Sequence, residues 1–220
     1  MDFQTLPQDA DRAEIVAMGE QVVSMFRHVR EAFLHLDSAP LGHVSGVAQQ
    51  VHRQERALID RMVRRSAWSS SLGGGAEEEA VFIPMHLDRV AGNIELLGAE
   101  AARALREGAL FTDRARREIG GLLDTVLELL EGLHDALQTG NRTLVRYILD
   151  EGRDCETRAN EYALFHEQRL IEGVCQPKAS SIYLAMLDHL RGIEWHARQV
   201  AHKLAPALVA PDTPPGYVPG

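Results

Sequence analysis

Two carboxylates four residues apart, Asp150 and Asp154, are the first candidates for chemistry in this sequence. In a helix this spacing places both side chains on one face, where they could share a cation. Arg146, Arg153 and Arg158 lie in the same segment and could pair with the acids instead, at roughly 0.2–0.5 kcal/mol per pair. The pattern favours a solvated acidic face, and a cation site remains the alternative.

Arginines gather in two places. One predicted helix, at about residues 41–67, carries five of them beside Glu55 and Asp60, and could dock an acidic partner or anionic lipid or simply face solvent. Three more fall in the first turn of a helix predicted to begin near residue 113, where positive charge opposes the helix dipole. The second group therefore indicates a contact patch for a partner or a neighbouring acidic helix. The arginines are Arg53, Arg56, Arg61, Arg64 and Arg65 in the first group and Arg114, Arg116 and Arg117 in the second.

No nucleophile and base can be placed together from the sequence, so no catalytic residue and no enzyme activity are predicted. Cys155 falls in a predicted helix and Cys175 in a predicted turn, and a reduced pair is expected. Two cysteines alone cannot supply a four-ligand zinc site. The serine- and glycine-rich segment 69–75 lacks the Gly-Lys-Ser/Thr that a phosphate-binding loop requires, and reads as a flexible loop.

Composition narrows the class of protein. The chain has 220 residues, of which 45% are hydrophobic and only 5% aromatic, a bias that favours packed helices over sheet. A formal net charge of −9 argues against nucleic acid as the main ligand. The apolar stretches are shorter than the roughly 18–20 residues of a membrane helix, and the N-terminus lacks a signal-peptide pattern. We therefore expect a cytoplasmic protein without direct membrane insertion.

The elements that position these residues repeat once along the chain. Apolar residues at helical spacing in segment 14–36 recur 104 residues later, and segment 86–96 resembles segment 189–199 at a spacing of 103. The first pair of matching sets is Ile15, Met18, Val22, Met25, Val29, Phe33 and Ile119, Leu122, Val126, Leu129, Leu133, Leu137. A repeat of half the chain predicts two copies of one small helical bundle.

The 3.6-residue periodicity accounts for six long antiparallel helices and no strand. They are expected at about 10–36, 41–67, 83–107, from a cap at Thr112 or Asp113 to 139, 142–172, and from Ser180 or Ser181 to 204. The predicted fold class is all-α, with two tandem three-helix bundles packed side by side. The predicted domains are residues 1–108 and 109–205, followed by a proline-rich disordered tail at 206–220.

Segment 166–204 resembles the last third of the PhoU family, especially the PhoU-type cytosolic domain of some bacterial sodium/phosphate cotransporters. The resemblance extends more weakly over 14–204 through the duplicated three-helix layout. The matching residues are His166, Arg169, Leu170, Gly173, Cys175, Ser180, Tyr183, Leu184, Leu187, Leu190, Ile193, His196 and Ala201.

This resemblance implies a pair of three-helix bundles, a homodimer, and regulation of phosphate transport through contacts with other proteins. The partners that it implies are a phosphate transporter subunit and/or a sensor kinase. Many members of the family also bind iron or zinc clusters on acidic helical surfaces. Their motif is an acid, Arg, an aliphatic residue, Gly, a second acid and often His.

The sequence departs from that motif in both copies. In the first copy Asp88 and Arg89 keep the opening pair, but Gly92 stands at the second acid and Asn93 follows. In the second copy the opening pair is Arg191 and Gly192, Glu194 precedes Trp195 at the second acid, and His196 ends the motif. An arginine where a carboxylate should bind metal inverts the local charge, so no metal ligand and no cofactor are predicted. The motif or partner-binding candidates are Asp88, Arg89, Asn93, Arg191, Glu194 and His196.

Three functions follow from these observations. The favoured hypothesis is a cytosolic PhoU-like regulator that acts through protein contacts. The second is a metal-binding helical protein that uses Asp150, Asp154 and neighbouring carboxylates. The third is a structural dimerisation module.

Overall fold

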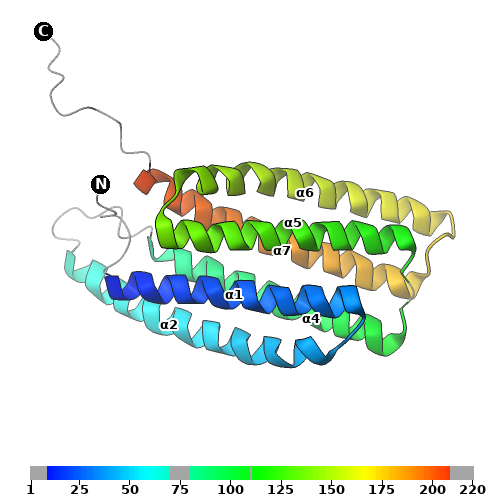
Figure 1. Cartoon of the computed structure of the whole chain (residues 1–220), viewed down its shortest axis with the longest axis horizontal. Helices are drawn as coiled ribbons and strands as arrows, with labels where there is room; N and C mark the ends of the chain where they lie inside the picture. Colours follow the sequence, from blue (N-terminus) through cyan, green and yellow to red (C-terminus); the bar gives the residue numbers. More distant parts are fainter. Residues whose placement is uncertain (1–8, 70–79, 110, 209–220) are drawn as a thin grey trace, which may run out of the picture.

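The computed structural model describes residues 9–69, 80–109 and 111–208, and in these residues the chain is all-α (Figure 1). The elements are α1 (Asp9–His35), a short 3-10 helix η1 (Ala39–His43), α2 (Val44–Ser69), α4 (Phe82–Glu107), α5 (Asp113–Thr139), α6 (Arg142–Ile171) and α7 (Pro177–Leu208). The predicted all-α fold class of two tandem three-helix bundles is confirmed. The glycine-rich loop predicted at 69–75 lies almost entirely outside the described residues.

Local sequence signals set most of the helix ends. The Thr112 hydroxyl accepts a hydrogen bond from the Ala115 backbone N–H at 3.2 Å, and the Asn141 side chain caps α6 in the same way. Gly108 and Gly140 end α4 and α5 with φ values of 59° and 63°, a left-handed conformation that glycine adopts without steric cost. The predicted caps and stops at these four positions are confirmed.

Two predicted helix starts are wrong. The second helix was expected from residue 41, but residues 39–43 form η1 and α2 begins at Val44. The last helix was expected to begin after a cap at Ser180 or Ser181, but it begins at Pro177. Proline is well tolerated in the first turn of a helix, and Ser180 already lies inside α7, where its hydroxyl donates to the Gln176 carbonyl.

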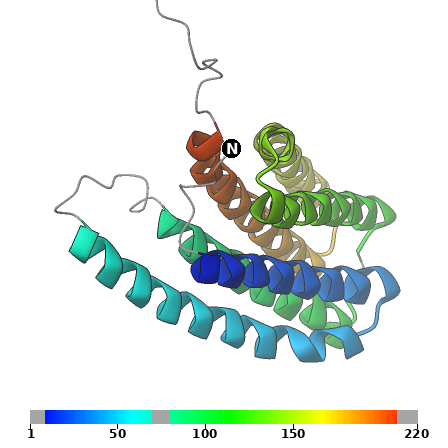
Figure 2. The ribbon, with the colours of Figure 1, turned by 60° about the vertical axis from the view of Figure 1, so that its left-hand side comes forward.

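The two bundles share one core. Helices α1, α2 and α4 pack together, α5, α6 and α7 pack together, and the halves meet where α4 lies on α7 and α1 on α5 (Figure 2). All twelve apolar residues of the duplicated pattern in α1 and α5 are buried. The buried residues of both halves form one continuous hydrophobic cluster, so the expectation that the halves pack side by side is confirmed.

The helix ends and their connections lie at two opposite ends of the molecule. At one end lie η1, the α4–α5 connection and the α6–α7 connection, and at the other lie the start of α1, the α5–α6 connection and the end of α7 (Figure 1). Helix α7 runs to Leu208, into the segment expected to form a tail from residue 206, because its apolar face continues through Leu204 and Ala205. Residues 209–220 lie outside the described part. No helix described is both long and apolar enough to cross a bilayer.

Candidate functional site

A surface hollow of about 450 Å³ lies between α2 and α4. Three of the motif residues identified in the sequence, Asp88, Arg89 and Asn93, line it from α4. Helix α2 contributes the opposite wall, including His52, and Leu96 lies at the edge with 53% of its surface exposed. The hollow combines a carboxylate, a guanidinium and an amide with an exposed apolar side chain, the mixture that protein contacts use.

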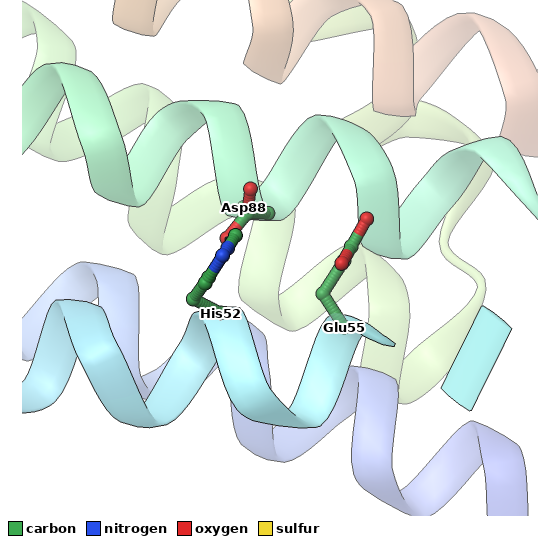
Figure 3. A group of neighbouring side chains, drawn as sticks. All are labelled: His52, Glu55 and Asp88. Carbon is green, nitrogen blue, oxygen red and sulfur yellow. The ribbon is translucent and has the colours of Figure 1, made fainter. Parts of the chain in front are cut away.

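Asp88 takes part in a three-residue cluster with His52 and Glu55, which project from α2 toward α4 (Figure 3). The His52 Nδ1 lies 3.1 Å from the Asp88 carboxylate. Burial raises the pKa of the Glu55 carboxyl, and the negative charge of Asp88 raises it further, although His52, Arg56 and Arg89 act in the opposite direction. The negative charge of Asp88 therefore disfavours ionisation of Glu55, and a cation bound between the two carboxylates would remove this repulsion.

The donors of this cluster fit a single divalent cation. One imidazole nitrogen and two carboxylate oxygens lie within 4.8 Å of one another. Zinc ligands lie about 2.0–2.2 Å from the metal, which allows at most about 4.4 Å between two of them, so small rotations of these side chains would be needed. Nitrogen and carboxylate donors together suit zinc, iron or manganese, with water completing the coordination. Arg56 and Arg89 nearby would weaken the attraction.

The second copy of the motif has no such donor set. Arg191 stands 103 residues after Asp88 in the repeat. Its guanidinium donates to the Asn160 side-chain oxygen on α6 at 2.5 Å and forms an ion pair with Asp188. A fixed positive charge thus joins α6 to α7 at the place where the first copy carries a carboxylate, and the residues present there do not fit a metal.

Glu194 and His196 lie between helices. Glu194 is 1% exposed, its carboxylate accepts a hydrogen bond from Arg198 at 2.7 Å, and burial raises its pKa despite that partner. The His196 Nδ1 lies 3.0 Å from the Nδ1 of His86, across the junction of α7 with α4. Burial, together with His86 and Arg89, lowers the pKa of His196 to about 4. Glu194 also packs against Gly152 of α6, where a Cβ would lie 2.7 Å from the Glu194 carboxylate, and the His86 contact holds His196 against α4.

The two copies of the motif also touch each other. Asn93 of the first copy packs on Gly192 of the second so closely that a Cβ at Gly192 would lie 2.6 Å from the Asn93 side-chain oxygen. The structure thus divides the six sequence candidates: Asp88 and Arg89 line the hollow, Glu194 is internal, and Arg191 bridges α6 and α7. Asn93 belongs to both the hollow and the junction, and His196 to the junction alone.

Helix α6 gives no support to a cation site at Asp150 and Asp154. Asp150 forms an exposed ion pair with Arg153, the solvated arrangement that the sequence favoured. Within the described residues the close group of three metal-ligating side chains lies instead at His52, Glu55 and Asp88. His52 and Glu55 were not predicted, although their separation of three residues on one helix is a signal that sequence reading could have used.

The arginine-rich helix α2 has partners within the chain. Arg61 and Arg65 bond the buried carboxylate of Asp11 at 3.3 and 2.6 Å, and Arg61 also bonds Glu14 at 2.7 Å. Arg64 pairs with Asp60 one turn away. These contacts join α2 to α1, so part of the arginine face serves the fold.

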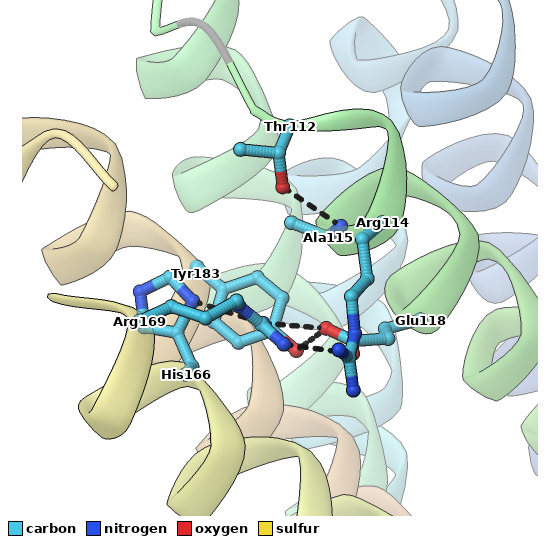
Figure 4. A network of polar contacts seen from close by, with 7 residues as sticks. All are labelled: Thr112, Arg114, Ala115, Glu118, His166, Arg169 and Tyr183. Carbon is cyan, nitrogen blue, oxygen red and sulfur yellow. Dashed lines mark hydrogen bonds and ion pairs between the residues drawn. The ribbon is translucent and has the colours of Figure 1, made fainter. Parts of the chain in front are cut away.

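A buried polar network ties α5, α6 and α7 together (Figure 4). The Glu118 carboxylate accepts hydrogen bonds from Arg169 at 2.8 and 3.1 Å, from the Tyr183 hydroxyl at 2.6 Å and from Arg114 at 2.8 Å. Burial raises the pKa of Glu118, but the bonds from Arg169, Tyr183 and Arg114 outweigh it and lower the pKa overall. The His166 ring stacks on Tyr183 at 4.2 Å between centroids. Both cysteines are free, as the sequence predicts, and the structure shows that both are buried.

Comparison with known proteins identifies the fold. No family model and no curated protein sequence matches the chain. The solved structure of PhoU from Pseudomonas aeruginosa is similar, with a TM-score of 0.82 and 17% sequence identity over 92% of this chain and 97% of that one. The phosphate transport system regulatory protein PhoU from Streptococcus pneumoniae matches with a TM-score of 0.69 and 12% identity over 92% and 95%. The fold is therefore PhoU-like.

Proposed function

We propose that this PhoU-like protein regulates phosphate transport, or the signalling that controls it, by binding other proteins in the cytoplasm. The observation that carries the proposal is the likeness of the whole chain to a PhoU structure, since it covers 92% of this chain and 97% of the other. The expected partners are a phosphate transporter subunit or a sensor kinase. A regulator of this kind needs recognition surfaces and no catalytic centre.

The hollow between α2 and α4 is the surface that we assign to this role. It offers the charged side chains of Asp88 and Arg89 and the exposed Leu96 on one helix, supported from behind by the core of the first bundle. Charged groups at the rim of an apolar contact give a partner its orientation, and the apolar contact gives affinity.

The test is affinity capture of the tagged full chain from cells grown in high and in low phosphate, followed by quantitative mass spectrometry. We expect enrichment of a phosphate transporter subunit or a sensor kinase that changes with phosphate. Leu96→Glu should reduce it, whereas Leu164→Glu, the same substitution at a leucine 66% exposed on α6, should not. Recovery of the chain alone under both conditions would contradict the proposal and favour a dimerisation module.

A second candidate function, binding of a divalent cation, is favoured by the cluster of His52, Glu55 and Asp88. Titration calorimetry of the chelator-treated full chain with zinc should show one site per chain. Asp88→Asn should abolish it and Asp150→Asn should leave it intact. Equal binding by the two variants would exclude this cluster.

A further inference from the structure

The ends of α1 and α4 and the start of α5 lie together at one end of the molecule (Figure 1), and a groove is formed there by side chains of these segments. It consists of two adjoining hollows that share Phe33 and Arg116. One is small and mostly apolar, with a volume of about 110 Å³, and the other is broader, about 540 Å³, and carries charged residues. We call the two together the end groove.

The small hollow has the size and lining of a socket for one side chain. Its walls include Phe33 from the last turn of α1, Leu36 directly after that helix, Ala104 from the last turns of α4 and Phe111 from the connection to α5. The rings of Phe33 and Phe111 lie 6.1 Å apart and stiffen one side. A volume of 110 Å³ corresponds to a few water molecules at about 30 Å³ each, or to one aliphatic or aromatic group.

Leu36 at the rim of this socket is held in an unfavourable conformation. Its φ of 55° is the left-handed region, where the residue after a helix is usually glycine, and it is the one non-glycine residue described with a positive φ. The side chain is nevertheless 59% exposed. A strained and exposed leucine adds little to the core, whereas it extends the apolar lining that a partner would contact.

The broad hollow carries two arginines, Arg116 and Arg117, that can bind carboxylates of a partner close to the socket. Arg116 and Arg117 are both exposed close to the start of α5 and form no ion pair with any residue that the structure describes. By contrast, their neighbour Arg114 is paired with Glu118. Of the two acids in the lining, Asp124 is engaged by Arg30 at 2.6 Å, which leaves Asp113 as the local competitor.

We propose that the end groove binds an acidic segment of a partner protein, with one apolar side chain in the socket and carboxylates on Arg116 and Arg117. A chain of net charge −9 repels acidic partners in general, so a pair of arginines without ion-pair partners among the described residues selects where such a segment can dock. A socket of defined size favours a peptide side chain over a lipid surface, which needs no pocket. The groove is separate from the hollow between α2 and α4.

Fluorescence anisotropy with the full chain tests this inference. The probes are fluorescein-labelled peptides in which two glutamates on each side flank one apolar residue, namely Leu, Ile, Phe or Trp. The controls replace the apolar residue with Ser, or every Glu with Lys. We expect at least one acidic apolar peptide to bind, and both control changes to weaken binding at least tenfold.

Three variants locate the binding. Arg116→Glu with Arg117→Glu should weaken it at least tenfold, whereas Arg142→Glu, in the first turn of α6 at the opposite end, should not. Leu36→Gly should also weaken binding while it raises the melting temperature, because glycine relieves the left-handed strain. If Leu36 had only a structural role, its replacement would not lower peptide affinity while it raised the melting temperature.

Two results would overturn the inference: no binding of any acidic peptide, or binding that the Arg116, Arg117 and Leu36 variants leave unchanged. Co-sedimentation with vesicles containing 30% phosphatidylserine that depends on the same arginines, without peptide binding, would assign the groove to a membrane and also refute it. The anisotropy assay measures peptide binding at the end groove only. Its outcome therefore does not depend on whether the affinity-capture experiment recovers a partner that serves phosphate transport.

Discussion

Removal of the Glu118 carboxylate should be among the most destabilising single changes in the second bundle. Glu118→Ala leaves the guanidinium of Arg169, which is 9% exposed, without the two hydrogen bonds that neutralise it, and leaves the fully buried Tyr183 hydroxyl without its acceptor. Loss of one member of a buried ion pair costs about 3–5 kcal/mol, and an unsatisfied buried hydroxyl adds about 1–3 kcal/mol. We expect a loss of at least about 4 kcal/mol in the free energy of unfolding, a large part of the roughly 5–15 kcal/mol of a typical domain.

Urea denaturation followed by circular dichroism measures this loss, with Glu131→Ala as the matched control. Glu131 also pairs with an arginine, Arg27 at 2.6 Å, but both side chains are at least 40% exposed, so its removal should cost less than about 1 kcal/mol. The double variant Glu118→Leu with Arg169→Met should be more stable than Glu118→Ala, since it leaves no unpaired buried charge. A cost for Glu118→Ala no larger than that of the control would refute the reasoning.

The same network makes a prediction about pH. Because the folded pKa of Glu118 lies below its ordinary value of 4.5, the carboxylate stabilises the fold fully above pH 4.5 and this contribution is lost as the pH falls through the lowered folded value. Glu118→Gln should therefore remove part of the loss of stability in acid. An unchanged acid limb in the plot of unfolding free energy against pH would contradict the assignment.

Two further predictions concern the junctions between helices. The pKa of His196 falls from 6.5 to about 4 on folding, so the unfolded chain binds the proton more readily and the free energy of unfolding should fall as the pH drops below 6.5. His196→Asn should make this decrease shallower in urea titrations between pH 6.5 and 4. An unchanged pH dependence in the variant would exclude His196 as its source. Gly152→Ala should cost about 1–3 kcal/mol because the new Cβ would lie 2.7 Å from the carboxylate of Glu194, and that side chain is buried and bonded to Arg198, so it has little room to move. Gly92→Ala, with nothing within 4 Å, should instead stabilise its helix by about 0.5–1 kcal/mol, and equal melting temperatures for the two variants would contradict the packing argument.

The fold was predictable because its signals are local or repeated. The apolar positions from Ile15 to Phe33 and their counterparts 104 residues later are all buried, and Thr112, Gly108, Gly140 and Asn141 end helices as their chemistry requires. The starts of α2 and α7 were less predictable because a 3-10 turn and a first-turn proline both read as breaks in the pattern.

The candidate site was predictable only in part. Asp88, Arg89 and Asn93 were identified through the family motif, but His52 and Glu55 reach Asp88 from another helix, and that meeting depends on how α2 is aligned along α4. Likewise, the motif placed Glu194 beside its degraded second copy, and only packing against α6 shows that its carboxylate is 1% exposed. Contacts between helices that are far apart in the chain produce no regular residue spacing, so they cannot be predicted from the sequence pattern.

The replacement of Asp88 by Arg191 across the repeat gives a duplicated molecule a direction. Two identical halves would offer a partner two equivalent places to land, and the complex could form in either orientation. Here one half presents a carboxylate cluster with a histidine, and the other presents a guanidinium already engaged by Asn160 and Asp188. We therefore expect a partner that recognises the first face to meet the opposite charge on the second, and to bind this chain in one orientation with a stoichiometry of one per chain.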